Sequence, residues 1–175
     1  MSAFTGTDAD LLVAIGKVTK AAANGLATCL YIAEASWLTS IPARTANTNT
    51  IATDITMDSG KVFISWYIGE DESVFSSSAI GAQGALSHEN ALTVFIPGHR
   101  DLVEAFLNNN INNEFVIIAP DREGNLRVIG ESYSPAFVVS DSLEVINSNE
   151  KEGYTFMFKA RGKIAANYTG AIPLT

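Results

Sequence analysis

Two neighbouring hydrophobic stretches form the clearest pattern in the chain, between residues 114 and 130. Phe115–Ala119 is an unbroken apolar run rich in β-branched residues, and Leu126–Ile129 is a second β-prone run. The segment between them, PDREGN, consists of turn formers and charged residues. Two such runs around a Gly-containing polar turn predict an antiparallel hairpin. An isolated hairpin is marginal in water, so other strands or a helix should cover it.

A helix is expected immediately before this hairpin, over residues 99–111. Four apolar residues share one stripe at helical spacing, and polar residues take the other side: Leu102, Val103, Phe106 and Leu107. We expect this helix to pack on the sheet that contains the hairpin. A second helix or an N-terminal arm is expected over residues 8–20, with a short strand as the alternative.

Alternation with a period of two predicts further strands. The clearest lies at residues 154–163, where four residues should face the core: Tyr154, Phe156, Phe158 and Ala160. Weaker patterns predict strands at residues 26–38, 51–55, 61–68, 86–96, 136–139 and 143–146. The turn formers at residues 58–60 predict that the strands within 50–68 pair as a hairpin. Residues 41–49 are expected to form a loop, and the tail from residue 167 has no regular pattern.

Many short strands with one inserted helix predict a mainly β fold. The expected architecture is an antiparallel β-sandwich or barrel with one flanking α-helix at residues 99–111. A length of 175 residues is most simply a single domain, residues 1–175.

Residues 69–85, GEDESVFSSSAIGAQGA, are rich in Ser, Gly and acidic residues. They are expected to form either a mobile surface loop or an arm that becomes ordered against a neighbouring subunit. The apolar side chains in such an arm would be buried by the neighbour. The candidate arm residues are Glu70, Asp71, Glu72, Val74, Phe75 and Ile80.

The formal net charge of −8 argues against a protein that wraps a nucleic-acid backbone, because such binding needs Lys and Arg at the phosphates. An acidic balance is compatible with a channel through which DNA slides without sticking. The charged content of 17% is low, which suits a chain that buries part of its surface against partners.

The sequence offers no catalytic or cofactor-binding constellation, so we expect a protein that is not an enzyme and carries no cofactor or metal. His88 and His99 are expected at opposite ends of one strand, as surface or capping residues. The single cysteine, Cys29, is expected to be a buried, inert thiol. The chain shows neither a signal-peptide pattern nor an apolar run of about 20 residues, so folding in a cytoplasm is expected.

One strand carries the only basic stripe, formed by Lys159, Arg161 and Lys163. We expect these cations to pair with acids across the sheet or across an interface. The alternative is a single-strand binder, which would need exposed aromatic side chains between the positive charges.

Five stretches in this order carry a resemblance to a known family: YIAEASWLTSIP, SGKVFISWYIGEDES, ALTVFIPGHRDLVEAFLNN, EFVIIAPDREGNLRVIG with a following SPA, and EGYTFMFKARGK with a later YTG. From about residue 31 to residue 170 the chain resembles tail-tube-like virion proteins of tailed bacteriophages, particularly those of phages and prophages of Bacteroidetes-type hosts. The resemblance implies a β-sandwich or barrel with a flanking helix. It also implies rings, usually hexameric, whose inner sheets join into one barrel.

The same resemblance implies a function and partners. The chain would be a structural subunit of a tail tube, located in the virion, and its stacked rings would form a conduit for DNA. Its partners would be further copies of itself and other tail proteins, with no membrane insertion. The turn Asp121, Arg122 and Glu123 would lie at a contact between rings. The alternatives are a tail terminator, a connector, a head-decoration protein, or a ligand-binding or single-strand-binding β-domain.

Overall fold

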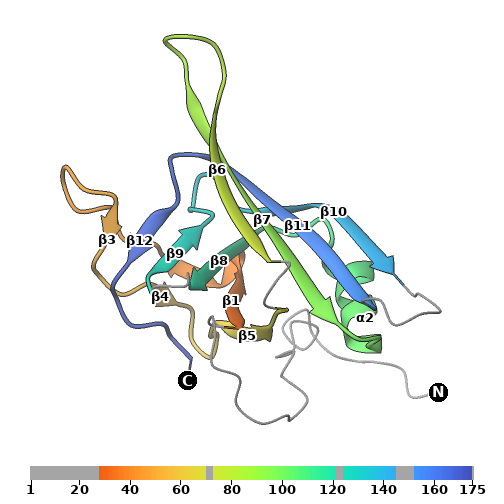
Figure 1. Ribbon diagram of the computed structural model, residues 1–175. Coiled ribbons are helices and arrows are strands. Elements are labelled where there is room, and N and C mark those ends of the chain that lie inside the picture. The colour runs from red at the N-terminus through yellow and green to blue at the C-terminus, as the bar shows by residue number, and fades with distance from the viewer. Residues whose placement is uncertain (1–27, 70–72, 121–123, 145–151, 175) are drawn as a thin grey trace.

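A computed structural model describes residues 28–69, 73–120, 124–144 and 152–174 (Figure 1). These residues form mainly strands, with one α-helix, so the expected mainly β class is confirmed. The large sheets are open at both ends, which makes the fold a sandwich and not a closed barrel. The expected helix or arm at residues 8–20, the acidic Glu70, Asp71 and Glu72, and the turn Asp121–Glu123 lie outside the described residues.

The larger sheet has six strands in the order β3-β12-β9-β8-β1-β5. Its strands are β3 (Thr50–Ile51), β12 (Ala166–Tyr168), β9 (Leu126–Ile129), β8 (Phe115–Pro120), β1 (Cys29–Glu34) and β5 (Ile64–Tyr67). All neighbours pair antiparallel except β12 and β3, which pair in parallel. A short 3₁₀ turn, η1 (Ala35–Trp37), follows β1 and leads into a small sheet of β2 (Leu38–Ser40) and β4 (Thr56–Met57).

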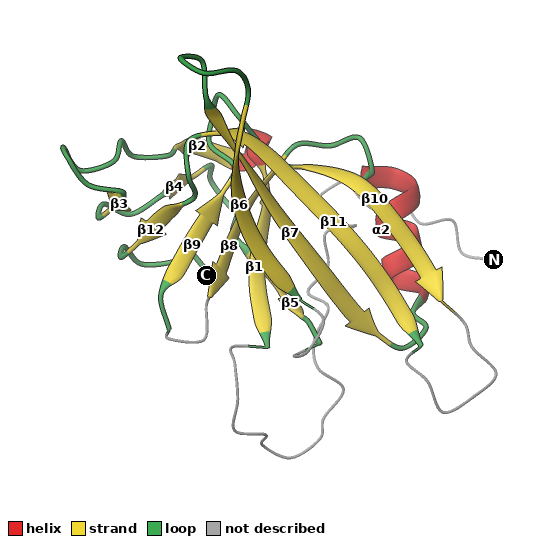
Figure 2. Cartoon of the chain, turned by 45° about the horizontal axis from the view of Figure 1, so that its top comes forward, coloured by secondary structure: helices red, strands yellow, loops and turns green. Residues whose placement is uncertain are grey.

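The second large sheet has four strands in the order β10-β11-β7-β6, with every neighbouring pair antiparallel. Its strands are β10 (Phe137–Glu144), β11 (Gly153–Gly162), β7 (Ser87–Pro97) and β6 (Val74–Ile80). Helix α2 (Asp101–Asn110) lies beside β10 and β11 in both views (Figures 1 and 2).

An aromatic cluster joins the two large sheets and the helix. Trp66 of β5 lies 6.2 Å from Phe156 and 6.4 Å from Phe158 of β11, measured between ring centroids. Phe106 of α2 lies 4.7 Å from Trp66 and 5.7 Å from Phe115 of β8. All five side chains are buried, so the helix contributes to the core between the sheets.

Three local predictions are confirmed. The β8–β9 hairpin pairs antiparallel in the predicted segment, from Ile117 opposite Ile129 to Pro120 opposite Leu126. Helix α2 falls within residues 99–111 and contacts the sheet that contains this hairpin, through Phe106. On β11 the four residues expected to face the core are all buried: Tyr154, Phe156, Phe158 and Ala160.

The expected hairpin within residues 50–68 is wrong. The turn itself forms, with Lys61 N–H donating to Asp58 C=O at 3.0 Å. The strands on either side pair with distant partners instead: β3 with β12, β4 with β2 and β5 with β1. These long-range pairings bury Ile55, Phe63 and Trp66 in the common core, whereas a separate two-stranded hairpin would leave them exposed.

Smaller differences concern residues 136–175 and Cys29. Instead of two strands, residues 137–144 form the single strand β10, with a shift in register between Val138 and Ser140. The tail adds β12, because its backbone fills the gap between β9 and β3. Cys29 is half-buried, and its thiol lies 3.8 Å from the Tyr31 hydroxyl, so the expectation of full burial is wrong.

Gly130 makes the passage from one large sheet to the other possible. It has a φ of 92°, and a Cβ there would lie 2.7 Å from the Phe115 carbonyl oxygen and 2.9 Å from the Ala136 nitrogen. Phe115 and Ala136 exchange two backbone hydrogen bonds of 2.8 Å at this point. Only glycine allows the chain to adopt this conformation so close to the bridge.

Candidate functional site

The four-stranded sheet ends on β6 at one side and β10 at the other (Figure 2). An edge strand presents backbone N–H and C=O groups to any strand that approaches, unless side chains or another segment block it. Both edges also carry exposed apolar side chains, since Val74 on β6 is 57% exposed and Val139 on β10 is 50% exposed. These two edges are the surfaces of the described chain best suited to pairing with another strand.

The β6–β7 hairpin includes most of the segment expected to be a loop or an arm. Val74–Ile80 pairs with β7 from Thr93 to Ser87 of the same chain, so both alternatives, a mobile loop and an arm ordered only by a neighbouring subunit, are wrong for these residues. The backbone of the long strand β7 needs hydrogen-bond partners here, and the serine-rich sequence supplies them despite its weak strand propensity. Of the candidate arm residues, Phe75 packs against the core and Val74 is exposed.

The end of this hairpin projects beyond the body of the molecule (Figure 1). From Val74 to Ser87 the sequence contains no charged residue, which is unusual in a chain with a net charge of −8. Ile80 is partly buried near the tip, and Leu86, just before the returning strand, is 61% exposed. An uncharged projection with an apolar side chain is suited to contact with another protein surface.

Sequence reasoning missed the β10 edge. Phe137 is 40% exposed and Leu143 is 44% exposed, on a strand whose two halves appeared in the sequence as separate short runs. The shift in register at residue 139 breaks the period-two alternation, which hid the continuity of the strand. The available signal was the density of apolar residues after Pro135, but it could not show that one side of the strand is unpaired.

The outer face of the four-stranded sheet, on the side away from the aromatic cluster, carries one ion-pair group. Glu89 Oε1 lies 2.7 Å from Lys159 Nζ, and Glu89 Oε2 lies 3.1 Å from Arg161 Nε. Hydrogen bonds from Lys159 and then Arg161 lower the pKa of the Glu89 carboxyl. The prediction that the basic stripe pairs with acids across the sheet is therefore confirmed for Lys159 and Arg161.

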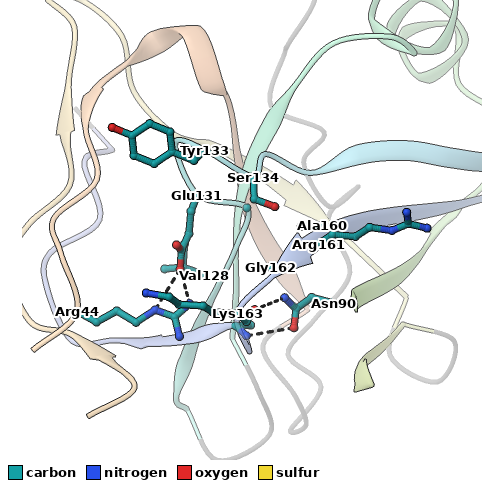
Figure 3. A pocket seen from close by; sticks show the side chains of 12 residues that line it. Arg44, Asn90, Val128, Glu131, Tyr133, Ser134, Ala160, Arg161, Gly162 and Lys163 are labelled. Carbon is teal, nitrogen blue, oxygen red and sulfur yellow. Dashed lines mark hydrogen bonds and ion pairs between the residues drawn. The ribbon is translucent and has the colours of Figure 1, made fainter. Parts of the chain in front are cut away.

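A hollow of about 260 Å³ lies between the ends of β7, β9 and β11 (Figure 3). Arg44 forms an ion pair with Glu131 there, and Asn90 Nδ2 donates to the Lys163 carbonyl oxygen at 2.8 Å. Asn90 Oδ1 accepts from the Ala165 N–H at 3.1 Å, and Tyr133 stands fully exposed at the rim. These inner polar groups already pair with one another. They therefore hold the loops together, and few polar groups remain to bind a ligand.

The two histidines lie in separate places. His99 Nε2 lies 2.9 Å from Glu104 Oε1, which also accepts from the Tyr154 hydroxyl at 2.9 Å. Burial raises the pKa of Tyr154, and Glu104 adds to this effect. His88 lies on β7 opposite Gly162. Within the part of the chain that the structure describes, no three side chains of His, Cys, Asp or Glu gather in a group able to hold a metal ion.

Comparisons with protein-family models, with curated proteins and with solved structures gave no match. Among the described residues, no helix is both long enough and apolar enough to cross a membrane.

Proposed function

We propose that this protein is a structural subunit of a bacteriophage tail tube or a similar tube. Copies would assemble into rings, six to a ring as the sequence resemblance implies, and the rings would stack into a conduit for DNA. The proposal includes location in the virion, contacts with other tail proteins, and no enzymatic role. The observation that carries it is the pair of unpaired edges, β6 and β10, on one antiparallel sheet.

Strand direction supports closure of such a ring. Neighbours alternate in direction across β10, β11, β7 and β6, so the two edge strands run in opposite directions. When copies are related by rotation about an axis along the strands, β6 of one copy meets β10 of the next antiparallel. The alternation then continues from copy to copy without interruption. This contact is heterologous, and it produces a ring when the rotation closes.

The same arrangement determines which surface would line the channel. The inner face of the four-stranded sheet is covered by the six-stranded sheet and α2, through residues such as Phe156 and Phe158. The outer face points away from both, although Phe95 on this face is buried close to Gly69. In a closed ring of these sheets, the outer face would point to the lumen and the six-stranded sheet would lie outside. The projecting β6–β7 hairpin would then reach along the tube axis towards the next ring.

The direct test is the assembled state of the full chain, observed by negative-stain microscopy and light scattering over a range of concentrations. Wild type should form rings or tubes. Val74→Lys places a charge on the β6 edge, and Val139→Lys places one on the β10 edge; either should prevent assembly. Leu174→Lys is the matched control, because Leu174 is 45% exposed but belongs to neither edge. A protein that stays monomeric at high concentration would contradict the proposal.

Other virion roles differ in the assembly they predict. A tail terminator or connector would form single rings that do not stack, and a head-decoration protein would bind capsids. Imaging of the purified protein separates tubes from single rings, and labelling of intact particles locates the protein.

A second candidate is a single-strand-binding domain, because two exposed aromatic residues lie near cations. Phe137 is opposite Lys159 in the sheet, and Tyr133 stands beside the hollow that Arg44 and Lys163 line. Stacking of bases on such side chains is one route to binding single strands. Titration with a fluorescent oligonucleotide tests it. Binding by wild type that is lost in Phe137→Ala or Tyr133→Ala would support it, and no binding at low salt would exclude it.

A further inference from the structure

The outer face of the four-stranded sheet holds three of its charges in a single group. Residues that pair directly across strands share a face, so the register identifies its members. They are Val74, Ser76, Ser78 and Ile80 on β6; Ser87, Glu89, Ala91, Thr93, Phe95 and Pro97 on β7; Gly153, Thr155, Met157, Lys159 and Arg161 on β11; and Phe137, Ser140, Ser142 and Glu144 on β10. Four of these residues are charged: Glu89, Lys159 and Arg161 lie together, and Glu144 lies at the other end of the sheet, opposite Gly153.

Glu89 bridges both cations. It lies directly opposite Arg161 in the register, and Lys159 is two residues along β11 on the same face. Each carboxylate oxygen pairs with one cation: Oε1 pairs with Lys159 and Oε2 pairs with Arg161. The Glu89 side chain is only 15% exposed, while Arg161 is 74% exposed. The carboxylate is therefore packed in place, and a solvent-facing guanidinium is held against it.

We propose that Glu89 prevents Lys159 and Arg161 from binding the phosphates of duplex DNA, so that this face lets DNA slide past. The inference rests on the proposed function, in which this face lines the channel. Lys and Arg on a channel wall would neutralise DNA phosphates, release the counterions of the DNA and so retain it. Stacked rings would multiply that attraction. The Glu89 carboxylate competes with phosphate for both cations and leaves this face with uncharged side chains around one compact ion-pair group.

The test compares Glu89→Gln with wild type on unassembled subunits, kept below the concentration at which they associate, so that the face is accessible. The control is Glu114→Gln, which removes one carboxylate from an exposed site outside this face and gives the same net charge. The probe is a short fluorescein-labelled DNA duplex, followed by fluorescence anisotropy over a series of salt concentrations. Circular dichroism and thermal melting check that each variant is folded.

Wild type and Glu114→Gln should bind the duplex equally weakly. Glu89→Gln should bind at least about threefold more tightly at low salt, and its log–log salt slope should steepen by about one to two, corresponding to one or two new phosphate contacts. The gain should disappear in Glu89→Gln/Lys159→Gln/Arg161→Gln. If Glu89→Gln fails to fold, Glu89→Thr replaces it, since Thr is a good strand former.

Three results would overturn the inference: equal DNA binding by Glu89→Gln and Glu114→Gln, a gain that persists without Lys159 and Arg161, or wild-type binding as tight as that of Glu89→Gln. The proposed function is tested separately by assembly. A chain that forms no rings while Glu89→Gln gains DNA binding contradicts the tube and leaves the masking role of Glu89 intact. A chain that forms tubes while Glu89→Gln gains no DNA binding supports the tube and contradicts the masking role of Glu89.

Discussion

The indole of Trp66 meets the ring of Phe106 edge-on, with ring centroids 4.7 Å apart and an interplanar angle of 87°. Trp66 belongs to β5 of the six-stranded sheet and Phe106 to α2, and both side chains are buried. The contact fixes the helix against the sandwich in a geometry that aromatic rings favour.

Truncation at this contact should be among the most costly in the protein. Phe106→Ala removes a ring that also lies 5.7 Å from Phe115, so the free energy of unfolding should fall by about 3–5 kcal/mol. Leu102→Ala, on the same helix at a site 47% exposed, should cost less than about 1 kcal/mol. Urea denaturation monitored by Trp fluorescence measures both, and equal costs would contradict the proposed position of the helix in the core.

The Tyr168 hydroxyl holds the C-terminal segment in place. It accepts from the Ile55 N–H at 3.1 Å and donates to the Ala171 carbonyl oxygen at 2.6 Å. Tyr168→Phe leaves the Ile55 donor without this partner and should cost about 1–3 kcal/mol of unfolding free energy. Tyr133→Phe, at a fully exposed site, should change nothing measurable.

Tyr168 also predicts a loss of stability at high pH. Burial raises the pKa of Tyr168 above its ordinary value of about 10. The neutral hydroxyl therefore stabilises the fold fully below about pH 10, and this contribution is lost as the pH rises from there through the higher folded pKa. The difference in melting temperature between wild type and Tyr168→Phe should shrink above about pH 10. A difference that stays constant to higher pH would contradict the cause given.

The ion pair of Arg44 with Glu131 connects the loop before β3 to the turn before β10. Its side chains are 15% and 36% exposed, so solvent screens it only in part. Arg44→Ala should cost about 1–3 kcal/mol, because Asn49 and Glu131 both lose a charged partner. Glu131→Gln should cost less, and the double variant should show coupling in a double-mutant cycle. Lys163→Ala, an exposed cation beside the hollow, is the control; additive effects of Arg44 and Glu131 would contradict the pairing.

The Glu89 ion pairs predict that the stability of the fold falls in acid. Its two cations lower the pKa of its carboxyl, so its contribution to stability is full above the ordinary value of about 4.3. The contribution is lost as the pH falls from there through the lower folded pKa. The melting-temperature difference between wild type and Glu89→Gln should be constant near neutral pH and should shrink below about pH 4.3. Thermal melts at a series of pH values measure it, and no change with acid would count against the bridge.

The projecting hairpin should matter for assembly and not for folding. Leu86 is 61% exposed, so Leu86→Asp should shift the free energy of unfolding by no more than about 0.5 kcal/mol. If the hairpin contacts the next ring, the same change should shorten or abolish tubes in negative-stain images while leaving single rings. Leu174→Asp is the control at another exposed apolar site. Normal tubes formed by Leu86→Asp would remove this residue from the contact.

Part of this fold was predictable from local pattern because local contacts produce it. The β8–β9 hairpin closes through its own turn, and α2 follows from apolar spacing that includes Val103 and Phe106. The alternation in β11 likewise showed which residues face the core. By contrast, the partners of β3, β4 and β5 lie far away in the chain, and the turn at residues 58–60 favoured a pairing that the core does not use.

The sequence by itself determined a mainly β chain with one helix, a basic stripe on β11 and an uncharged segment before β7. Periodicity and charge are properties of neighbouring residues, and they determine these features locally. Only the tertiary structure decided that β6 and β10 are unpaired edges and that Glu89 is the acid that Lys159 and Arg161 share. Strand order and register join residues some 70 positions apart, and the hydrogen bonds that select them form only when the whole core is buried.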